Sequence, residues 1–397
     1  MTRVALHAQE FPCAGRDLRT VETPVVYAGA SRQEDLVRRF FAATIVAVMP
    51  FLASGAVSAR DAAPFARPRV PYATATHPPQ YPHLLERYGK ARPPYEVPGV
   101  DYYVGLPAIT LIDPTRPRSL PGCATYIPSS HAVSVTRSNC VLRGYDFRKG
   151  GGLQLQIPNG VANTTVDSSL FGLDGNPGFS TSLIDYRGAG LTVTDSTFLG
   201  PGQDPMYFDD GSSGTVTFER NYFFGISGDA LDFGSTQTVI VQYNAFVAIG
   251  MNPASHPDAV QFCGGHLGPP SHESYNLLYQ PVGVGNGGNQ GIQVAVQCGG
   301  TIDGYEADHN VLVAPDPHDL TMSYGIASNG LNVKILDNYI DAEGSYGPIY
   351  PFPKGAGSAI CRGNVARTAG SEYVGGVTYS WKAGQDIAGD FGEFTCE

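Results

Sequence analysis

Apolar and polar residues alternate in short runs that recur along most of the chain. Residues 216–223 read Val-Thr-Phe-Glu-Arg-Asn-Tyr-Phe, and residues 239–246 repeat the apolar and Asn positions of this run 23 positions later. Alternation with a period of two is typical of a β-strand, and self-similarity at a fixed period of about 20–50 residues is typical of a solenoid. The pattern predicts an all-β solenoid of about nine or ten coils. The run ends at Phe147, Phe171, Phe198, Phe223, Phe246, Leu278, Leu312, Ile340 and Ala366.

An Asn recurs two residues before the end of the run. An Asn at a repeated bend tolerates the left-handed backbone conformation and can hydrogen-bond to its counterpart in the next coil. We therefore expect an internal, structural Asn ladder. Its members are Asn221, Asn244, Asn276, Asn310, Asn338 and Asn364, with Ser169 and Ser196 in the equivalent places of earlier coils.

A second series of polar residues follows an apolar residue in each coil. This order places the apolar residue inside the coil and the polar residue on its surface. Successive coils are spaced like strands, about 4.8 Å apart, so stacked carboxylates repel one another unless a proton or a cation intervenes. We interpret the series as a functional row, in which Asp209 and Asp232 are catalytic candidates and the other members are candidates for substrate binding. Its expected members are Gln156, Asp185, Asp209, Asp232, Gln261 and Gln293.

The first 59 residues have the character of a leader. Arg38 and Arg39 precede an apolar stretch, and residues 57–59 form a small-x-small cleavage pattern. This order is typical of a secretory signal peptide, and its depth in the chain suggests a start of translation near residue 36. We expect residues 1–59 to be a misassigned leader plus signal peptide, 60–100 to be a Pro-rich arm, and 101–397 to be the solenoid domain with a cap at each end. The expected location is secreted or periplasmic.

The chain after residue 59 is acidic and contains six cysteines. It has 19 basic and 31 acidic residues, for a net charge of −12, which argues against nucleic-acid binding. No later segment is long and apolar enough to predict a membrane span, and we expect a monomer. An even number of cysteines in an exported chain indicates disulfides. The expected pairs are Cys123–Cys140, Cys263–Cys298 and Cys361–Cys396.

The two longest coils contain insertions that are rich in His. Loops that extend from a rigid framework commonly carry binding and catalytic residues. His256 lies just before Asp258 and beside the predicted polar row, which makes both residues catalytic candidates. His266 and His272 are candidates for substrate binding.

Coils of this length, with short strands and an Asn ladder, resemble the right-handed parallel β-helix of the pectin-lyase-like superfamily. The resemblance covers roughly residues 100–390. Members of that superfamily are mostly secreted enzymes that act on polysaccharides, so the resemblance implies a polysaccharide as the substrate.

Two narrower resemblances compete. Asp209-Asp210 and Asp232 are spaced like the catalytic Asp residues of polygalacturonases, although this chain has no Asn-Thr-Asp, Gly-His-Gly or Arg-Ile-Lys segment. Asp316-Pro317-His318-Asp319 has the letters of a tetrapeptide in the catalytic groove of alginate C5-epimerases. The second resemblance implies a catalytic role for His318.

The expected activity is a lyase or a C5-epimerase on a polysaccharide that contains uronic acids. Either reaction needs the sugar carboxylate neutralised, a base and a proton donor. In so acidic a chain, Ca²⁺ is the natural neutralising group, and carboxylates are suitable ligands. The base would be His256 or His318, and Tyr207 or Tyr324 would donate the proton. The expected calcium ligands are Asp185, Asp209 and Asp232.

Two alternatives remain open at the level of sequence. A glycoside hydrolase needs two carboxyl groups, and Asp209 with Asp232, or Asp185 with Asp232, would supply them on nearby coils. A non-catalytic solenoid would use the same polar row to bind sugar hydroxyls or Ca²⁺. The sequence does not identify the sugar or its linkage.

Overall fold

The described part of the chain belongs to the larger of two units. The chain divides into Met1–Ala66 and Arg67–Glu397, and the predicted leader lies outside the described residues. The structure, a computed structural model, describes residues 77–172, 182–200, 206–208, 212–234, 237–251, 257–263, 271–281, 290–295, 302–314, 324–328, 332–341, 349–351, 359–367, 370–374, 377–384, 390–391 and 394–395.

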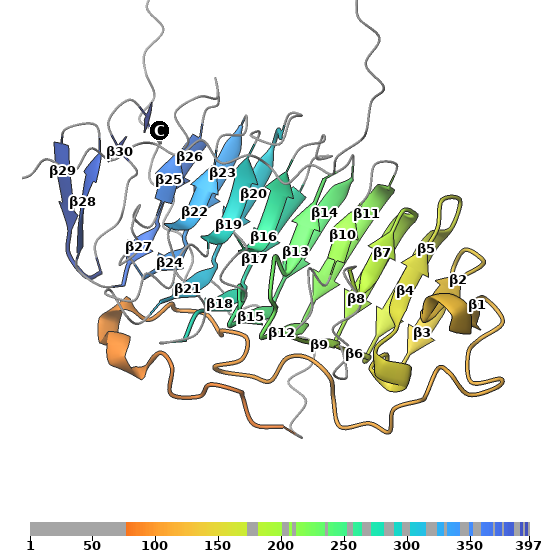
Figure 1. Ribbon diagram of the computed structural model, residues 1–397. Coiled ribbons are helices and arrows are strands. Elements are labelled where there is room, and N and C mark those ends of the chain that lie inside the picture. Colours follow the sequence, from red (N-terminus) through yellow and green to blue (C-terminus); the bar gives the residue numbers. More distant parts are fainter. Residues whose placement is uncertain are drawn as a thin grey trace, which may run out of the picture. The chain divides into compact units, whose positions relative to one another are not determined.

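Three parallel sheets form the solenoid, and each coil adds one strand to each sheet (Figure 1). The predicted all-β parallel solenoid is therefore confirmed. The first sheet contains β1 (Ala124–Ile127), β2 (Ala132–Val135), β4 (Gln154–Ile157), β7 (Ile184–Tyr186), β10 (Met206–Phe208), β13 (Leu231–Phe233), β16 (Asp258–Cys263), β19 (Gln290–Ala295), β22 (Tyr324–Ser328) and β25 (Ile349–Pro351).

The other two sheets complete each coil. The second sheet contains β3 (Val141–Arg143), β5 (Ala162–Asp167), β8 (Ala189–Thr194), β11 (Ser213–Glu219), β14 (Thr238–Gln242), β17 (Ser271–Ser274), β20 (Tyr305–Asp308), β23 (Val333–Leu336) and β26 (Ala359–Arg362). The third sheet contains β6 (Leu170–Gly172), β9 (Thr197–Leu199), β12 (Tyr222–Phe224), β15 (Ala245–Val247), β18 (Leu277–Tyr279), β21 (Val311–Val313), β24 (Tyr339–Ile340) and β27 (Val365–Ala366).

Alternation along each strand sends apolar side chains into the solenoid. In β14, Val239 and Val241 are buried, whereas Thr238 and Gln242 are only partly covered. The run-ending residues lie in register from coil to coil, as predicted. Four ring pairs stack inside, with centroids 4.4–4.7 Å apart, which matches the spacing of the coils. These pairs are Phe147–Phe171, Phe171–Phe198, Phe198–Phe223 and Phe223–Phe246.

The predicted Asn ladder stands at the corner between the second and third sheets. Oδ1 of Asn276 accepts hydrogen bonds from the backbone N–H and the Nδ2 of Asn244, and Nδ2 of Asn276 donates to Oδ1 of Asn310. One detail of the expectation is wrong, because the residue before the Asn has the left-handed conformation, as at Tyr243 (φ 58°) and Tyr275 (φ 56°). That residue makes the bend, and the bend turns the Asn inward to satisfy buried backbone groups.

The N-terminal arm covers the outer face of the third sheet. Residues of the arm, including Leu85, Tyr95 and Val97, pack against Ala245 and Val311. Figure 1 shows the arm, coloured orange, running along these strands, and it includes the 3₁₀-helix η1 (Glu86–Ala91). The arm thus covers much of the outer face of the third sheet, although Phe224 of β12 remains exposed.

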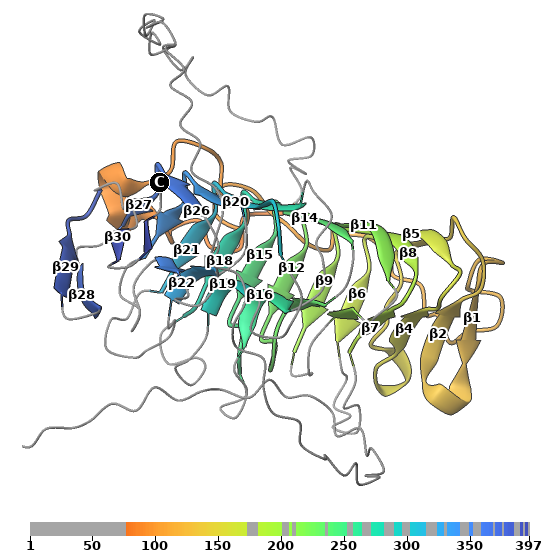
Figure 2. The same ribbon diagram turned by 90° about the horizontal axis from the view of Figure 1, so that it is seen from above.

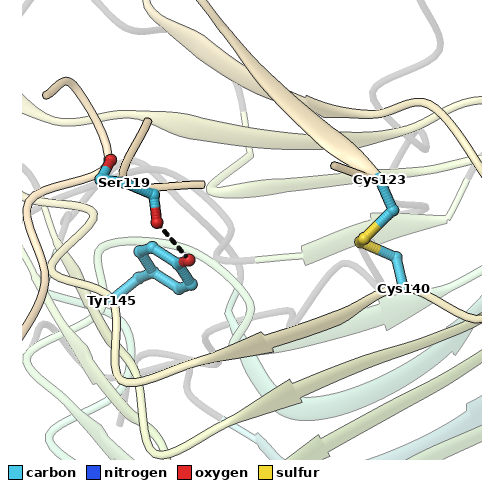
Figure 3. Close-up of a disulfide and its surroundings, with 4 residues drawn as sticks. All are labelled: Ser119, Cys123, Cys140 and Tyr145. Atoms are coloured by element: carbon cyan, nitrogen blue, oxygen red, sulfur yellow. Dashed lines mark hydrogen bonds between the residues drawn. A yellow bond between two sulfur atoms is a disulfide. The ribbon is translucent and has the colours of Figure 1, made fainter. Parts of the chain in front are cut away.

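At its N-terminal end, the solenoid is closed by an antiparallel pair and a disulfide. Strand β1 pairs with β2 and covers the edge of the first sheet. Cys123 and Cys140 form the predicted disulfide, and nearby the Tyr145 hydroxyl donates to the Ser119 carbonyl at 2.8 Å (Figure 3). Cys361 is also in a disulfide, whose partner lies outside the described residues. The predicted Cys263–Cys298 pair is not tested, because Cys298 lies outside them too.

Two antiparallel hairpins follow the last coil. They are β28 (Gly370–Val374) with β29 (Val377–Trp381) and β30 (Asp390–Phe391) with β31 (Phe394–Thr395), seen beyond β27 in Figure 2. In the parts of the chain that the structure describes, no helix is long and apolar enough to cross a membrane.

Candidate functional site

The predicted polar row lies on the first sheet, with one correction to its register. Gln156 pairs with Asp185, and at the other end Asp232 pairs with Gln261 and Gln261 with Gln293. Between them, however, Tyr207 is the partner of both Asp185 and Asp232. The prediction of Asp209 at this rung is therefore wrong by two residues.

The physical reason for this error is the period of the strand. A slip of two residues leaves every side chain on the same face, so the alternation of apolar and polar positions cannot detect it. Asp209 itself lies outside the described residues.

The corrected register does not fit the predicted calcium site. Asp185 and Asp232 lie on coils that are separated by the Tyr207 coil, so the expected stack of three adjacent carboxylates is not formed. Across the described ranges, no group of three or more His, Cys, Asp and Glu side chains is arranged to hold a metal ion. No step of the chemistry proposed below uses calcium.

Three carboxyl groups instead gather where β13 and β16 lie side by side. The backbone N–H of Asp258 donates to Oδ1 of Asp229 at 2.6 Å. With the amide nitrogen of Gln261 turned toward the two acids, it lies 3.1 Å from Oδ2 of Asp229 and 3.1 Å from Oδ2 of Asp258. Asp232 is in register with Gln261. We call Asp229, Asp232, Asp258 and Gln261 the acidic cluster.

The members of the acidic cluster differ in exposure. Asp258 has no exposed surface, whereas Asp229, Asp232 and Gln261 are half-buried. Burial raises the pKa of Asp258 well above its usual range, and repulsion from Asp229 and Asp232 raises it further. The Oδ1 atom of Asp258 has no hydrogen-bond partner. The cluster thus holds a fully buried carboxyl group, whose surroundings favour its protonated form, beside two carboxyl groups that reach the surface.

The N-terminal part of the row is polar without a comparable cluster. Gln156 donates to Oε1 of Gln154 at 2.8 Å, and Gln154 donates to the Ser182 carbonyl at 2.9 Å. Asp185 accepts a hydrogen bond from Nε of Arg187 at 3.2 Å. These side chains extend a hydrogen-bonding surface along the first sheet from the acidic cluster.

His272 does not lie beside this row. It belongs to β17 of the second sheet, where its register partners are Ile240 and Glu306. The prediction that placed His272 at the first-sheet site is therefore wrong. The insertion ends before β17, and His272 already belongs to that strand. His272 lines a separate hollow of about 390 Å³ with Ser271, Ser274, Gly304, Glu306, Asp308 and Lys334.

Other predicted site residues are not placed by the structure. Tyr207 and Gln293 are described only as positions in β10 and β19. The candidates that lie outside the described residues are Asp209, His256, His266 and His318.

Two acids were not predicted from the sequence. Asp229 was overlooked because it precedes β13 and is not part of the outward-facing polar row. The sequence signal that could have indicated it is the second Asp in the Asp-Ala-Leu-Asp segment. Glu273 is fully buried inside the solenoid, where its Oε2 accepts a hydrogen bond from Tyr305 at 2.8 Å. Burial raises the pKa of Glu273 to about 8. Glu273 lies in the all-polar strand Ser-His-Glu-Ser, where no alternation of apolar and polar residues marks the side chains that point inward.

Comparison of the chain with protein-family models, with curated proteins and with solved structures gave no match. The architecture is a parallel β-solenoid, consistent with the pectin-lyase-like fold.

Proposed function

We propose that this protein is a secreted enzyme that hydrolyses a polysaccharide, and that the acidic cluster is its active site. The observation that carries the proposal is the meeting of Asp229, Asp232 and Asp258 where β13 and β16 lie side by side. A structural surface gains nothing from three close carboxyl groups, because their mutual repulsion costs free energy. A glycosidase needs such groups.

The roles follow from the surroundings of each acid. Asp229 receives two N–H donors, from Asp258 and Gln261, and such donors favour the ionised form. Asp229 is therefore the base, which takes a proton from the attacking water. Asp232, on the same face, donates a proton to the oxygen of the departing sugar. Asp258 does not reach the surface and touches no substrate.

The charge of the face bears on the substrate. The acidic cluster makes this face negative, and the nearest described cation on the row, Arg187, is already paired with Asp185. A polyanion would be repelled from such a surface. We therefore propose a glycan with few acidic groups, which the amides of Gln154 and Gln156 contact through its hydroxyls.

Product chemistry tests this proposal. The chain from residue 60 onward is incubated with neutral glycans and polyuronates while reducing ends and ultraviolet absorbance are followed together. New reducing ends without absorbance from an unsaturated sugar are the expected result. If no neutral glycan gives new reducing ends, the proposal of a hydrolase is wrong.

One observation favours a second candidate, a lyase that acts on a polyuronate. Tyr207 lies in register with Asp232 on the neighbouring coil, and a tyrosine beside a carboxylate is a suitable proton donor for β-elimination. In the same assay, a lyase gives absorbance together with reducing ends on one polyuronate. That outcome would replace the hydrolase by the lyase.

A further inference from the structure

The amide of Gln261 occupies a position that no substrate-facing role explains. Its nitrogen lies 3.1 Å from one oxygen of Asp229 and 3.1 Å from one oxygen of Asp258. An amide nitrogen carries two hydrogens, so a single Gln can donate to both acids at once. The side chain therefore bridges the two carboxyl groups and fixes their separation.

The two bridged acids are not equivalent. Asp229 accepts a second hydrogen bond, from the Asp258 backbone, and is half-buried. Asp258 is fully buried, and its Oδ1 has no partner. A negative charge is stabilised by donors and by water, so it costs less on Asp229 than on Asp258.

We propose that Gln261 is a positioning residue that holds the two acids at a fixed separation, while the burial of Asp258 keeps the proton of this pair there and leaves Asp229 ionised as the base. The inference rests on the proposed function and adds its regulation by pH. While Asp258 is neutral, Asp229 keeps its charge and its orientation. When Asp258 loses its proton at alkaline pH, two bridged carboxylates repel each other and the site is disrupted.

Among the residues that the structure describes, few titratable groups face Asp258. On the β13 side they are Asp229 and Asp232. On the other side, β19 consists of Gln-Gly-Ile-Gln-Val-Ala and carries no charged residue. Within β16 the remaining titratable residue is Cys263, at the opposite end of the strand. The raised pKa of Asp258 agrees with its burial and with these acidic neighbours.

Infrared titration of the free protein tests the proton placement without substrate. Glu273→Gln serves as the background, because Glu273 is another fully buried acid whose pKa is raised by burial. We expect a buried carboxylic-acid band near neutral pH that disappears in Asp258→Asn and whose midpoint moves by about one pH unit or more in Gln261→Leu. The control is Gln242→Leu, which changes a partly exposed residue of β14 and should leave the midpoint unchanged. A band that is absent, or that persists in Asp258→Asn, overturns the proposal, as does an unchanged midpoint in Gln261→Leu.

Kinetics add a second readout. Gln261→Leu removes a donor from Asp229, so the acid limb of the pH–activity curve should move to higher pH, with kcat falling about tenfold or more and KM nearly unchanged. A fall in activity of the same size at every pH indicates a merely structural role and contradicts the inference. If the infrared result holds but no glycan is cleaved, the proton placement stands and the proposed function fails.

Discussion

The backbone N–H of Asp258 donates a hydrogen bond of 2.6 Å to Oδ1 of Asp229, which is 29 residues earlier in the chain but on the adjacent coil. This contact depends on the parallel pairing of β13 with β16, in which Asp232 is in register with Gln261. The stacking of coils thus assembles the acidic cluster from two short segments. The same stacking gives the chain several properties that can be measured.

The buried Glu273 makes stability depend on pH. Its pKa is raised to about 8 in the folded protein, whereas its ordinary value is 4.5. Between these values the unfolded chain releases a proton that the folded chain keeps. The free energy of unfolding therefore falls as pH rises, by about 1.4 kcal/mol per pH unit from this group, and the loss ends above the folded pKa.

Glu273→Gln removes this dependence. The Gln oxygen still accepts the Tyr305 hydrogen bond, so the variant should be more stable than wild type at pH 8 by on the order of 3 kcal/mol. Denaturant unfolding at pH 5 and pH 8 measures the difference. Glu306→Gln, which faces outward on the next coil, is the control and should keep the wild-type slope. Equal slopes in wild type and Glu273→Gln would contradict the prediction.

The Asn ladder predicts a large effect of one substitution. Asn276→Ala removes hydrogen bonds to the Val241 carbonyl and to Asn310, and it leaves the buried N–H of Asn244 without an acceptor. We expect a loss of about 2–4 kcal/mol in the free energy of unfolding. Thermal or denaturant unfolding measures it.

The control for this substitution is Gln242→Ala, because Gln242 is a partly exposed amide close to the ladder. It should change stability by less than about 0.5 kcal/mol. Similar losses for the two variants would show that the ladder contributes no more than a surface amide.

The disulfide at the N-terminal end should stabilise the first coils. Cys123 and Cys140 are 17 residues apart, and a loop of this size corresponds to about 3 kcal/mol in the chain-entropy account. The double variant Cys123→Ala, Cys140→Ala should lower the melting temperature and speed amide hydrogen exchange in β1 and β2 more than in β14. Uniform exchange across the solenoid would contradict the local role of this bond.

Repetition explains how much of the fold could be predicted from the sequence. The Phe and Asn positions were predicted correctly because every coil has the same residue types at the same positions of its interior. Asp209 was misplaced because its slip of two residues preserves the inward and outward faces. The outer face offers no such repetition, so register there depends on loop lengths that the pattern does not encode.

The arm and the acidic cluster show what pattern cannot supply. Leu85, Tyr95 and Val97 are apolar without a clear period, so their packing on the third sheet was visible only in the structure. Asp258 was a candidate because of its neighbour His256, yet its complete burial and its bond to Asp229 come from tertiary contacts. Gln261 was predicted to bind substrate, whereas its amide faces two acids of the chain itself.

The most direct test of the account is the rate of reducing-end formation by three variants on the glycan that the wild type cleaves best. Asp229→Asn and Asp232→Asn should each lose about 10²–10⁴-fold in kcat while the melting temperature stays close to that of wild type. Asp303→Asn, an exposed acid before β20, should keep full activity. Activity of Asp229→Asn or Asp232→Asn within a few-fold of wild type would contradict the claim that the acidic cluster is the active site.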